Sequence, residues 1–149
     1  MAPLDHRIRV VTQALYDLVK DNEGPLGLNY VGRYDEKRIP RYPSVVVSPG
    51  DMGKTLHGTN TFNIELTASL WVYHGDMTVP HAVRNEEDLR LVEKIEEVVE
   101  EDYTLGGLVI FGFIATQVPG VVQPTSSKSE IIAGTRMDWV GLSQRRMSA

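Results

Sequence analysis

Cysteine is absent from this chain of 149 residues, so disulfide bonds, zinc–thiolate sites and thiol nucleophiles are excluded. No apolar run approaches the roughly 20 residues that cross a bilayer. The first residues also lack the apolar core of a signal peptide. The net charge of −5 has the wrong sign for general affinity to nucleic acid, which depends on neutralising phosphates. We therefore expect a soluble protein with no membrane partner and no sequence-specific contact to DNA.

What the chain does contain is enough apolar sequence for one folded domain. It is 42% hydrophobic and 23% charged, as in an ordinary globular protein. Two domains in this length would each be cramped. We expect a single domain over residues 1–142, followed by a short basic tail over 143–149 that contains Arg145 and Arg146.

Apolar spacing predicts two amphipathic helices. Apolar residues recur at intervals of three and four over 3–21, which is the stripe of a helix: Leu4, Ile8, Val11, Leu15 and Leu18. A second stripe lies within about a third of a helical wheel and predicts a helix from about 85 to 105: Leu91, Val92, Ile95, Val98 and Val99. The adjacent Gly106-Gly107 permits the positive φ that reverses a chain from helix to strand.

Alternation and β-branched runs predict the strands. Over 62–73 one side of the strand is apolar, from Phe62 to Val72, and the other is polar until Trp71 and Tyr73. Further strands are predicted near 29–33, 44–47, 108–118 and 130–142, separated by loops that include 48–60 and 119–130. This order predicts an α+β fold, a mostly antiparallel or mixed sheet flanked by two amphipathic helices.

One segment resembles a nucleotide-binding loop. Residues 48–55 follow a β-branched strand and end in Gly53-Lys54-Thr55, as a P-loop does. However, Ser48 stands where the motif requires its first glycine, and the residues after Thr55 are poor helix formers. We therefore favour a mobile hairpin loop and keep an enzyme that binds nucleotide through Gly50 to Thr55 as a remote alternative.

Other catalytic or metal chemistry has little support. None of the four histidines has the i, i+4 spacing of a helical zinc pair. His74 and His81 flank a loop that contains Asp76, so a metal site there is the alternative, but we expect solvated histidines in loops. The carboxylates of the second helix lie on its polar arc, whereas acid–base catalysis needs a buried member with a raised pKa. We expect no enzyme, no metal and no cofactor.

Charge is unevenly distributed and suggests contact surfaces. Residues 86–102 contain nine acidic and two basic residues, a net charge of −7. The first interpretation is that these carboxylates form a helix face exposed to solvent. The second is that they contact a basic surface of a partner or line a pore, because anions near a helix C-terminus are unfavourable without a partner. The loop over residues 33–42 contains basic residues beside tyrosines and so has the opposite charge. It could bind the acidic helix of a neighbouring copy. The candidate contact residues are Arg33, Lys37, Arg38, Arg41, Glu93, Glu97, Glu100 and Glu101.

A combination of segments is more specific than any single motif. The long alternating strand ends in Leu70-Trp71-Val72-Tyr73-His74-Gly75, and the acidic helix passes into Asp102-Tyr103-Thr104-Leu105-Gly106-Gly107-Leu108-Val109. The last strand contains Ala133-Gly134-Thr135-Arg136-Met137-Asp138-Trp139-Val140. Over about residues 4–142 the chain resembles the tail terminator and tail completion proteins of long-tailed bacteriophages.

The resemblance implies a virion structural protein that acts by geometry. Such a subunit assembles into a ring, usually a hexamer, that caps the tail tube, ends its growth and joins the tail to the head connector. DNA passes through the ring, and a monomer in solution is compatible with ring closure at the tube tip. The implied partners are the tail tube protein and connector proteins, and the implied location is the tail–neck region of a virion assembled in the host cytoplasm. A head–tail adaptor or another neck component is the alternative within virions.

Overall fold

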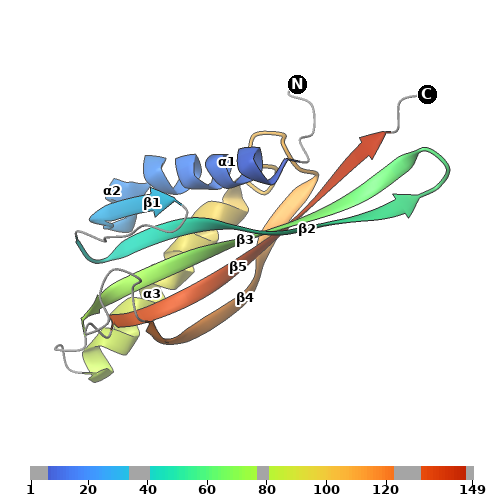
Figure 1. Ribbon diagram of the computed structural model, residues 1–149. Helices are drawn as coiled ribbons and strands as arrows, with labels where there is room; N and C mark the ends of the chain where they lie inside the picture. The colour runs from blue at the N-terminus through green and yellow to red at the C-terminus, as the bar shows by residue number, and fades with distance from the viewer. Residues whose placement is uncertain (1–6, 34–40, 77–80, 123–131, 147–149) are drawn as a thin grey trace.

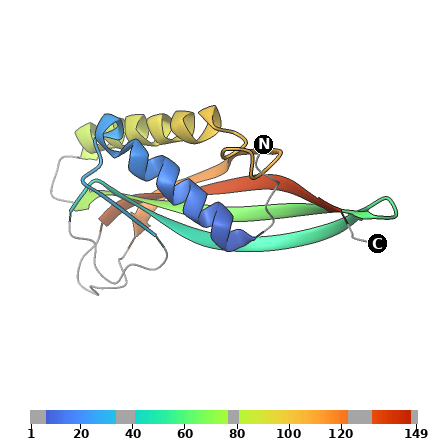
Figure 2. The ribbon, with the colours of Figure 1, turned by 90° about the horizontal axis from the view of Figure 1, so that it is seen from above.

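The computed structural model describes residues 7–33, 41–76, 81–122 and 132–146. They form a five-stranded mixed sheet in the order β1-β2-β3-β5-β4, with helices packed on one face (Figures 1 and 2). The helices are α1 (Ile8–Asp21), α2 (Glu23–Leu26) and α3 (His81–Glu101). The strands are β1 (Tyr30–Arg33), β2 (Ser44–His57), β3 (Thr61–Asp76), β4 (Phe111–Val122) and β5 (Ile132–Arg146). The predicted α+β class and the two long amphipathic helices are confirmed.

Only one pair of strands is parallel. β1 runs parallel to β2, and β2, β3, β5 and β4 pair antiparallel in that order. The chain therefore enters the sheet at one edge, makes the β2–β3 hairpin, and places α3 as the crossover before β4 and β5 fill the other edge (Figure 1). α1 packs over β1 and β2, and α3 packs over β4, so the two long helices divide one face between them.

The core lies between this face and the two helices. The predicted stripes supply much of it, because Val11 and Leu15 of α1 and Ile95 and Val99 of α3 are fully buried. Val19, rather than the predicted Leu18, continues the fully buried face of α1. From the sheet, β3 contributes every second residue from Ile64 to Val72. The polar side of the same strand faces away, and Glu65 is exposed there. The predicted register of β3 is thus confirmed.

Trp139 packs against two glycines that the sequence alone does not connect. Its side chain is 1% exposed, and it lies on the helix-covered face beside Gly112 of β4 and Gly141 of its own strand. A Cβ atom at Gly112 or Gly141 would approach the indole ring to 2.3 or 2.2 Å. The indole ring occupies the space that a side chain at either position would fill, so both positions require glycine. Gly112 is therefore not the weak point that strand propensity suggests.

The turn between α3 and β4 shows why acids are tolerated at a helix C-terminus. Leu105, Gly106 and Gly107 all have positive φ, at 47°, 68° and 93°. Gly106 donates its N–H to Asp102 Oδ1 at 3.2 Å, and Val109 donates to the carbonyl of Thr104 at 3.1 Å. The expected reversal at the two glycines is confirmed, and it extends back to the buried Leu105.

Several boundaries differ from the sequence-based expectation. The predicted loop 48–60 is mostly strand, since β2 continues to His57 and pairs with β3 up to Thr61. The predicted tail begins inside β5, which runs to Arg146 and pairs with β3 throughout. Of the second expected loop, residues 119–122 belong to β4, and residues 123–130 lie outside the described residues. In each case cross-strand pairing supplies order that local propensity does not.

Candidate assembly surfaces

A β-arm projects beyond the helices at one end of the sheet (Figures 1 and 2). It consists of residues 49–57 of β2, the turn 58–60, and residues 61–63 of β3, with the end of β5 alongside as a third strand. Residues 49–57 are all exposed, whereas residues 44–47 of the same strand are all buried. The arm is an extension of the sheet that no described helix covers.

The two sides of the arm differ in chemistry. Leu56, Phe62 and Arg145 lie in one cross-strand row, and Lys54 shares the next row with the core residue Ile64, so these side chains are on the helix side. Met52 shares that side through its pairing with Leu66. Leu56 is 62% exposed and Met52 is 44% exposed. The helix side of the arm is therefore apolar with two cations.

The opposite side of the arm is polar. Asn63 is flanked there by Thr55 of β2 and Gln144 of β5. Gln144 Nε2 donates to Asn63 Oδ1 at 3.0 Å across the pair. This side has the composition of an ordinary solvated sheet surface, so the apolar side is the one that suits a partner.

The sheet face away from the helices carries a second apolar area, the open-face patch. It consists of Phe111, Phe113 and Val118 of β4, which are 43%, 42% and 47% exposed. The two phenylalanine rings are stacked with centroids 6.2 Å apart. Polar groups adjoin the patch, since Asp138 accepts from Ser69 and Thr116 at 3.1 and 2.7 Å. Exposed aromatic pairs rimmed by polar groups are typical of protein contact surfaces.

The edge strands β1 and β4 are poorly suited to pairing with another strand, although β1 covers only residues 44–47 of β2 and leaves the outer edge of the arm without a described partner strand. β1 has only four residues. β4 is irregular between Ile114 and Thr116, and the N–H of Ile114 donates to Glu100 Oε1 of α3 at 3.3 Å. Short edge strands, bulges and covered N–H groups all oppose edge-to-edge pairing. Contact with other chains is therefore better served by the arm and the sheet face than by these edges.

The predicted acidic contact residues divide into two groups. Glu93, Glu97 and Glu101 are exposed on α3, as expected for a contact or solvated surface. Glu100 instead holds the β4 backbone, and the neighbouring Glu96 accepts from Gln117 Nε2 at 2.6 Å. Part of the acidic excess is thus used inside the chain, where carboxylates tie α3 to β4.

The predicted basic residues are only partly placed. Lys37 and Arg38 lie outside the described residues. Arg41 is exposed just before β2. Arg33 ends β1, where its guanidinium hydrogen-bonds Gln13 and lies 5.6 Å from the centroid of the Tyr16 ring on α1. Arg33 therefore helps to hold β1 against α1.

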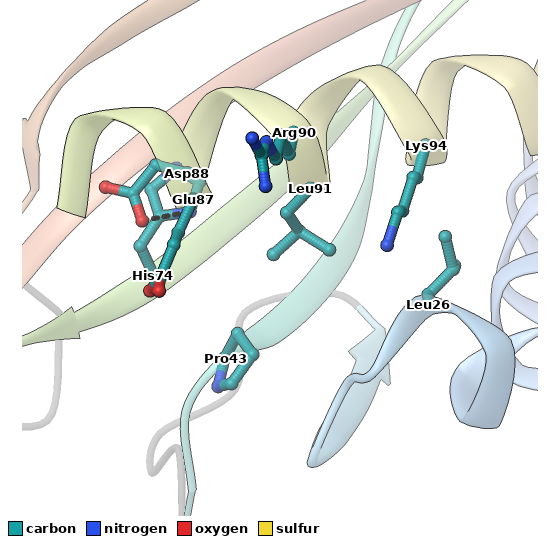
Figure 3. A pocket seen from close by; sticks show the side chains of 8 residues that line it. All are labelled: Leu26, Pro43, His74, Glu87, Asp88, Arg90, Leu91 and Lys94. Atoms are coloured by element: carbon teal, nitrogen blue, oxygen red, sulfur yellow. Dashed lines mark ion pairs between the residues drawn. The ribbon is translucent and has the colours of Figure 1, made fainter. Parts of the chain in front are cut away.

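A pocket of about 300 Å³ lies between the start of α3 and the sheet (Figure 3). His74 forms part of its wall together with Asp88, Arg90 and Lys94 of α3. The expectation of a solvated His74 is wrong, because its side chain is only 2% exposed. Its Nδ1 lies 3.3 Å from Asp88 Oδ1, and its Nε2 lies 2.8 Å from Thr135 Oγ1 of β5.

The hydroxyl of Thr135, the imidazole of His74 and the carboxylate of Asp88 follow one another in the same order as in a hydrolytic triad. The hydroxyl, however, is not accessible to a substrate. A nucleophilic hydroxyl must meet substrate. Thr135 is 6% exposed and does not line the pocket. The arrangement is well suited to fasten the start of α3 to β3 and β5, because a buried polar network rigidifies the elements that it joins.

The segment that resembles a P-loop has a different geometry. Lys54 pairs with Ile64, and Thr55 pairs with Asn63, in an extended hairpin that continues to His57. A phosphate site of that type needs the N-terminus of a helix directly after the motif. Here a turn and β3 follow instead.

Among the described residues, no cluster of three or more metal-ligating side chains occurs. Nor does that part of the chain include a helix long and apolar enough to span a bilayer.

Comparison with known proteins does not assign the chain to a family. No protein-family model and no curated protein matches it. Among solved structures, the nucleotide-free catalytic domain of the histidine kinase ThkA aligns over 95% of each chain at 9% sequence identity. The TM-score of 0.30 is too low for that alignment to carry an argument about fold or activity.

Sequence reasoning missed the two apolar surfaces. The arm has the composition of a loop, because Pro49, Gly50 and Gly53 interrupt the strand pattern. For the open-face patch, the alternation of Phe111 and Phe113 with Gly112 and Ile114 is the signal in the sequence for two unlike faces.

Proposed function

We propose that this chain is a ring-forming structural subunit of a phage tail, which caps the tail tube and ends its growth. The proposal starts from the resemblance of residues 70–75 and 102–109 to tail terminator proteins. Such a protein works by occupying the surface on which the next tube subunit would be added. Its requirements are contact surfaces and a rigid frame, with no reaction to catalyse.

The observation that carries the proposal is the presence of two unlike apolar surfaces on one small domain. The arm presents Met52 and Leu56, and the open-face patch presents Phe111 and Phe113, at separate parts of the sheet. A terminator ring needs contacts of two kinds, one between neighbouring subunits and one with the tube, and the contact between subunits is heterologous when the ring is closed. Separate apolar surfaces allow one domain to make both kinds of contact. A domain with a single apolar patch would suit a two-fold dimer instead.

Rigidity of the frame also supports this function. α3 is fixed to β4 through Glu96 and Glu100, and its start is fixed through Asp88 to the buried His74. A subunit that defines a ring by its shape must hold the angle between its contact surfaces. The hydrogen bonds of Glu96 and Glu100 to β4 and the contact of Asp88 with the buried His74 serve that purpose.

The test is removal of this gene product during assembly of the phage that encodes it, with particles examined by electron microscopy. Tails of uncontrolled length that fail to join heads are the expected result. Tails of normal length beside heads that leak DNA would replace the proposal with a head-side adaptor. Normal infectious particles would overturn a structural role in the virion.

A further inference from the structure

The helix side of the β-arm is a sheet surface without a cover in the described chain. Its exposed members are Met52, Lys54, Leu56 and Arg145, and Phe62 is half-buried beside them. The charged members of these rows, Lys54 and Arg145, are both cationic. An occupant of this surface should therefore combine apolar contact with negative charge.

The chain itself carries a surface of that description on α3. Leu89, Glu93 and Glu97 are spaced by four residues, which places them along one ridge of the helix. All three are exposed, and Leu89 is 56% exposed. Arg90 is ion-paired with Glu86 at 2.7 Å, which leaves the ridge with an apolar residue followed by two acids.

These two surfaces do not meet within one copy. Figure 1 shows the arm extending past the helices at one end of the sheet, whereas α3 begins near the other end and reaches only about the middle of the sheet. One copy therefore cannot satisfy both within itself, whereas a row of copies can satisfy them in turn. The surfaces are different from each other, so the contact is heterologous and can close into a ring.

We propose that the helix side of the arm of one copy docks on the Leu89–Glu93–Glu97 ridge of a second copy. Leu56 packs beside Leu89, while Lys54 and Arg145 face the two glutamates. This inference rests on the proposed function in that it names the contact between neighbouring subunits of the ring. Salt weakens such a contact, because its charge pairs form at the rim of an exposed surface.

Because the chain has no cysteine, single introduced thiols report this contact without background. L56C chains and L89C chains are mixed at millimolar concentration in dilute salt and oxidised. The matched control is Thr55→Cys, which is the neighbouring residue on the opposite side of the arm. We expect at least tenfold more cross-linked heterodimer from the L56C and L89C mixture than from the T55C and L89C mixture. Equal yields, or cross-linking of L56C mainly to itself, would overturn the proposal.

Charge reversal provides a second readout. Lys54→Glu with Arg145→Glu should reduce the L56C–L89C product at least fivefold while circular dichroism stays unchanged, since both side chains are exposed. A partner chain with Glu93→Lys and Glu97→Lys should restore it. Reversal without loss, or loss without restoration, would contradict the proposed pairing.

The two proposals fail separately. Rings on tube tips that give no arm-to-α3 cross-link would remove this contact and leave the terminator function standing. A cross-link that follows the predicted pattern, together with normal tails after gene removal, would keep the contact and remove the function.

Discussion

The two halves of the β2–β3 hairpin have the same hydrogen-bonded geometry and opposite environments. In the base, Val45 and Val47 pair with Val72 and Leu70, and all four are buried under the helices. In the arm, Leu56 pairs with Phe62, but Leu56 remains 62% exposed. The alternation of β3 continues through both halves. What distinguishes them is the cover supplied by the helices rather than the strand pattern itself.

This contrast shows that the arm stabilises the monomer very little. Apolar side chains that stay in water contribute no transfer free energy, whereas those in the base contribute roughly 25 cal/mol for each Å² removed from water. The arm nevertheless retains the exposed Met52 and Leu56 on one side, whereas Phe62 beside them is partly buried against the core. Retained apolar surface that does not serve the fold of one chain is consistent with a role in contact between chains.

The largest expected difference between the base and the arm of the hairpin is the loss of stability when an apolar side chain is truncated to alanine. Leu70→Ala should lower the free energy of unfolding by roughly 2–5 kcal/mol, because it opens a cavity beneath the helices. Ile95→Ala should do the same from the α3 side, since both residues are fully buried. Leu56→Ala in the arm should change the free energy by less than about 0.5 kcal/mol. Urea unfolding measures all three variants, and a large loss in Leu56→Ala would show that the arm packs within the monomer.

The next effect tests the packing of Trp139. Gly112→Ala or Gly141→Ala should cost roughly 1–3 kcal/mol, because the added Cβ would overlap an indole ring that is 1% exposed. The control is Gly24→Ala, where no atom lies within 4 Å of the added carbon. Thermal unfolding should rank the two strand glycines together and well below the control. Similar midpoints for all three would mean that the indole does not occupy that space.

A smaller effect is expected inside the arm. A Cβ at Gly50 would lie 2.4 Å from Thr67 Oγ1 and 2.7 Å from the Thr67 carbonyl oxygen, whereas nothing lies within 4 Å of one at Gly53. Gly50→Ala should cost about 1 kcal/mol, because an exposed strand can shift to relieve the overlap. Gly53→Ala should stay within about 0.5 kcal/mol of the parent. Amide exchange along 51–67 is the sensitive measurement, and faster exchange in Gly53→Ala than in Gly50→Ala would contradict this geometry.

Elements whose structure depends on residues close together in the chain could be predicted from the sequence. The alternation of β3 and the spacing of α3 each give their own buried face, and Gly106-Gly107 marks the reversal after α3. The strand character of the arm could not be predicted, because Pro49, Gly50 and Gly53 have low β propensity and β3 supplies the pairing.

Long-range features of the candidate site were equally hidden. His74 gave no sign of burial, since its partner Thr135 is 61 residues away and a lone histidine has no spacing to interpret. Exposed Glu93 and Glu97 were correctly placed on the polar arc of α3. The separate use of Glu100 was not predictable, because the Ile114 N–H that it accepts belongs to a bulge created by strand pairing.

The smallest expected effect on stability comes from removing one exposed carboxylate, either from the α3 ridge or from the open face of the sheet. Glu65→Ala and Glu97→Ala should each stay within about 0.5 kcal/mol of the parent in urea unfolding, because both side chains are exposed and neither fills the core. They should differ in association. Glu97 lies on the ridge proposed to receive the arm, so its loss should reduce the cross-link between arm and α3 in dilute salt. Glu65 lies on the opposite side of the sheet, and its removal should leave that yield unchanged. The difference should disappear in concentrated salt, where both variants and the parent associate equally weakly. A larger loss of association in Glu65→Ala than in Glu97→Ala would move the contact from α3 to the open face of the sheet, because the open-face residues are those that share its side.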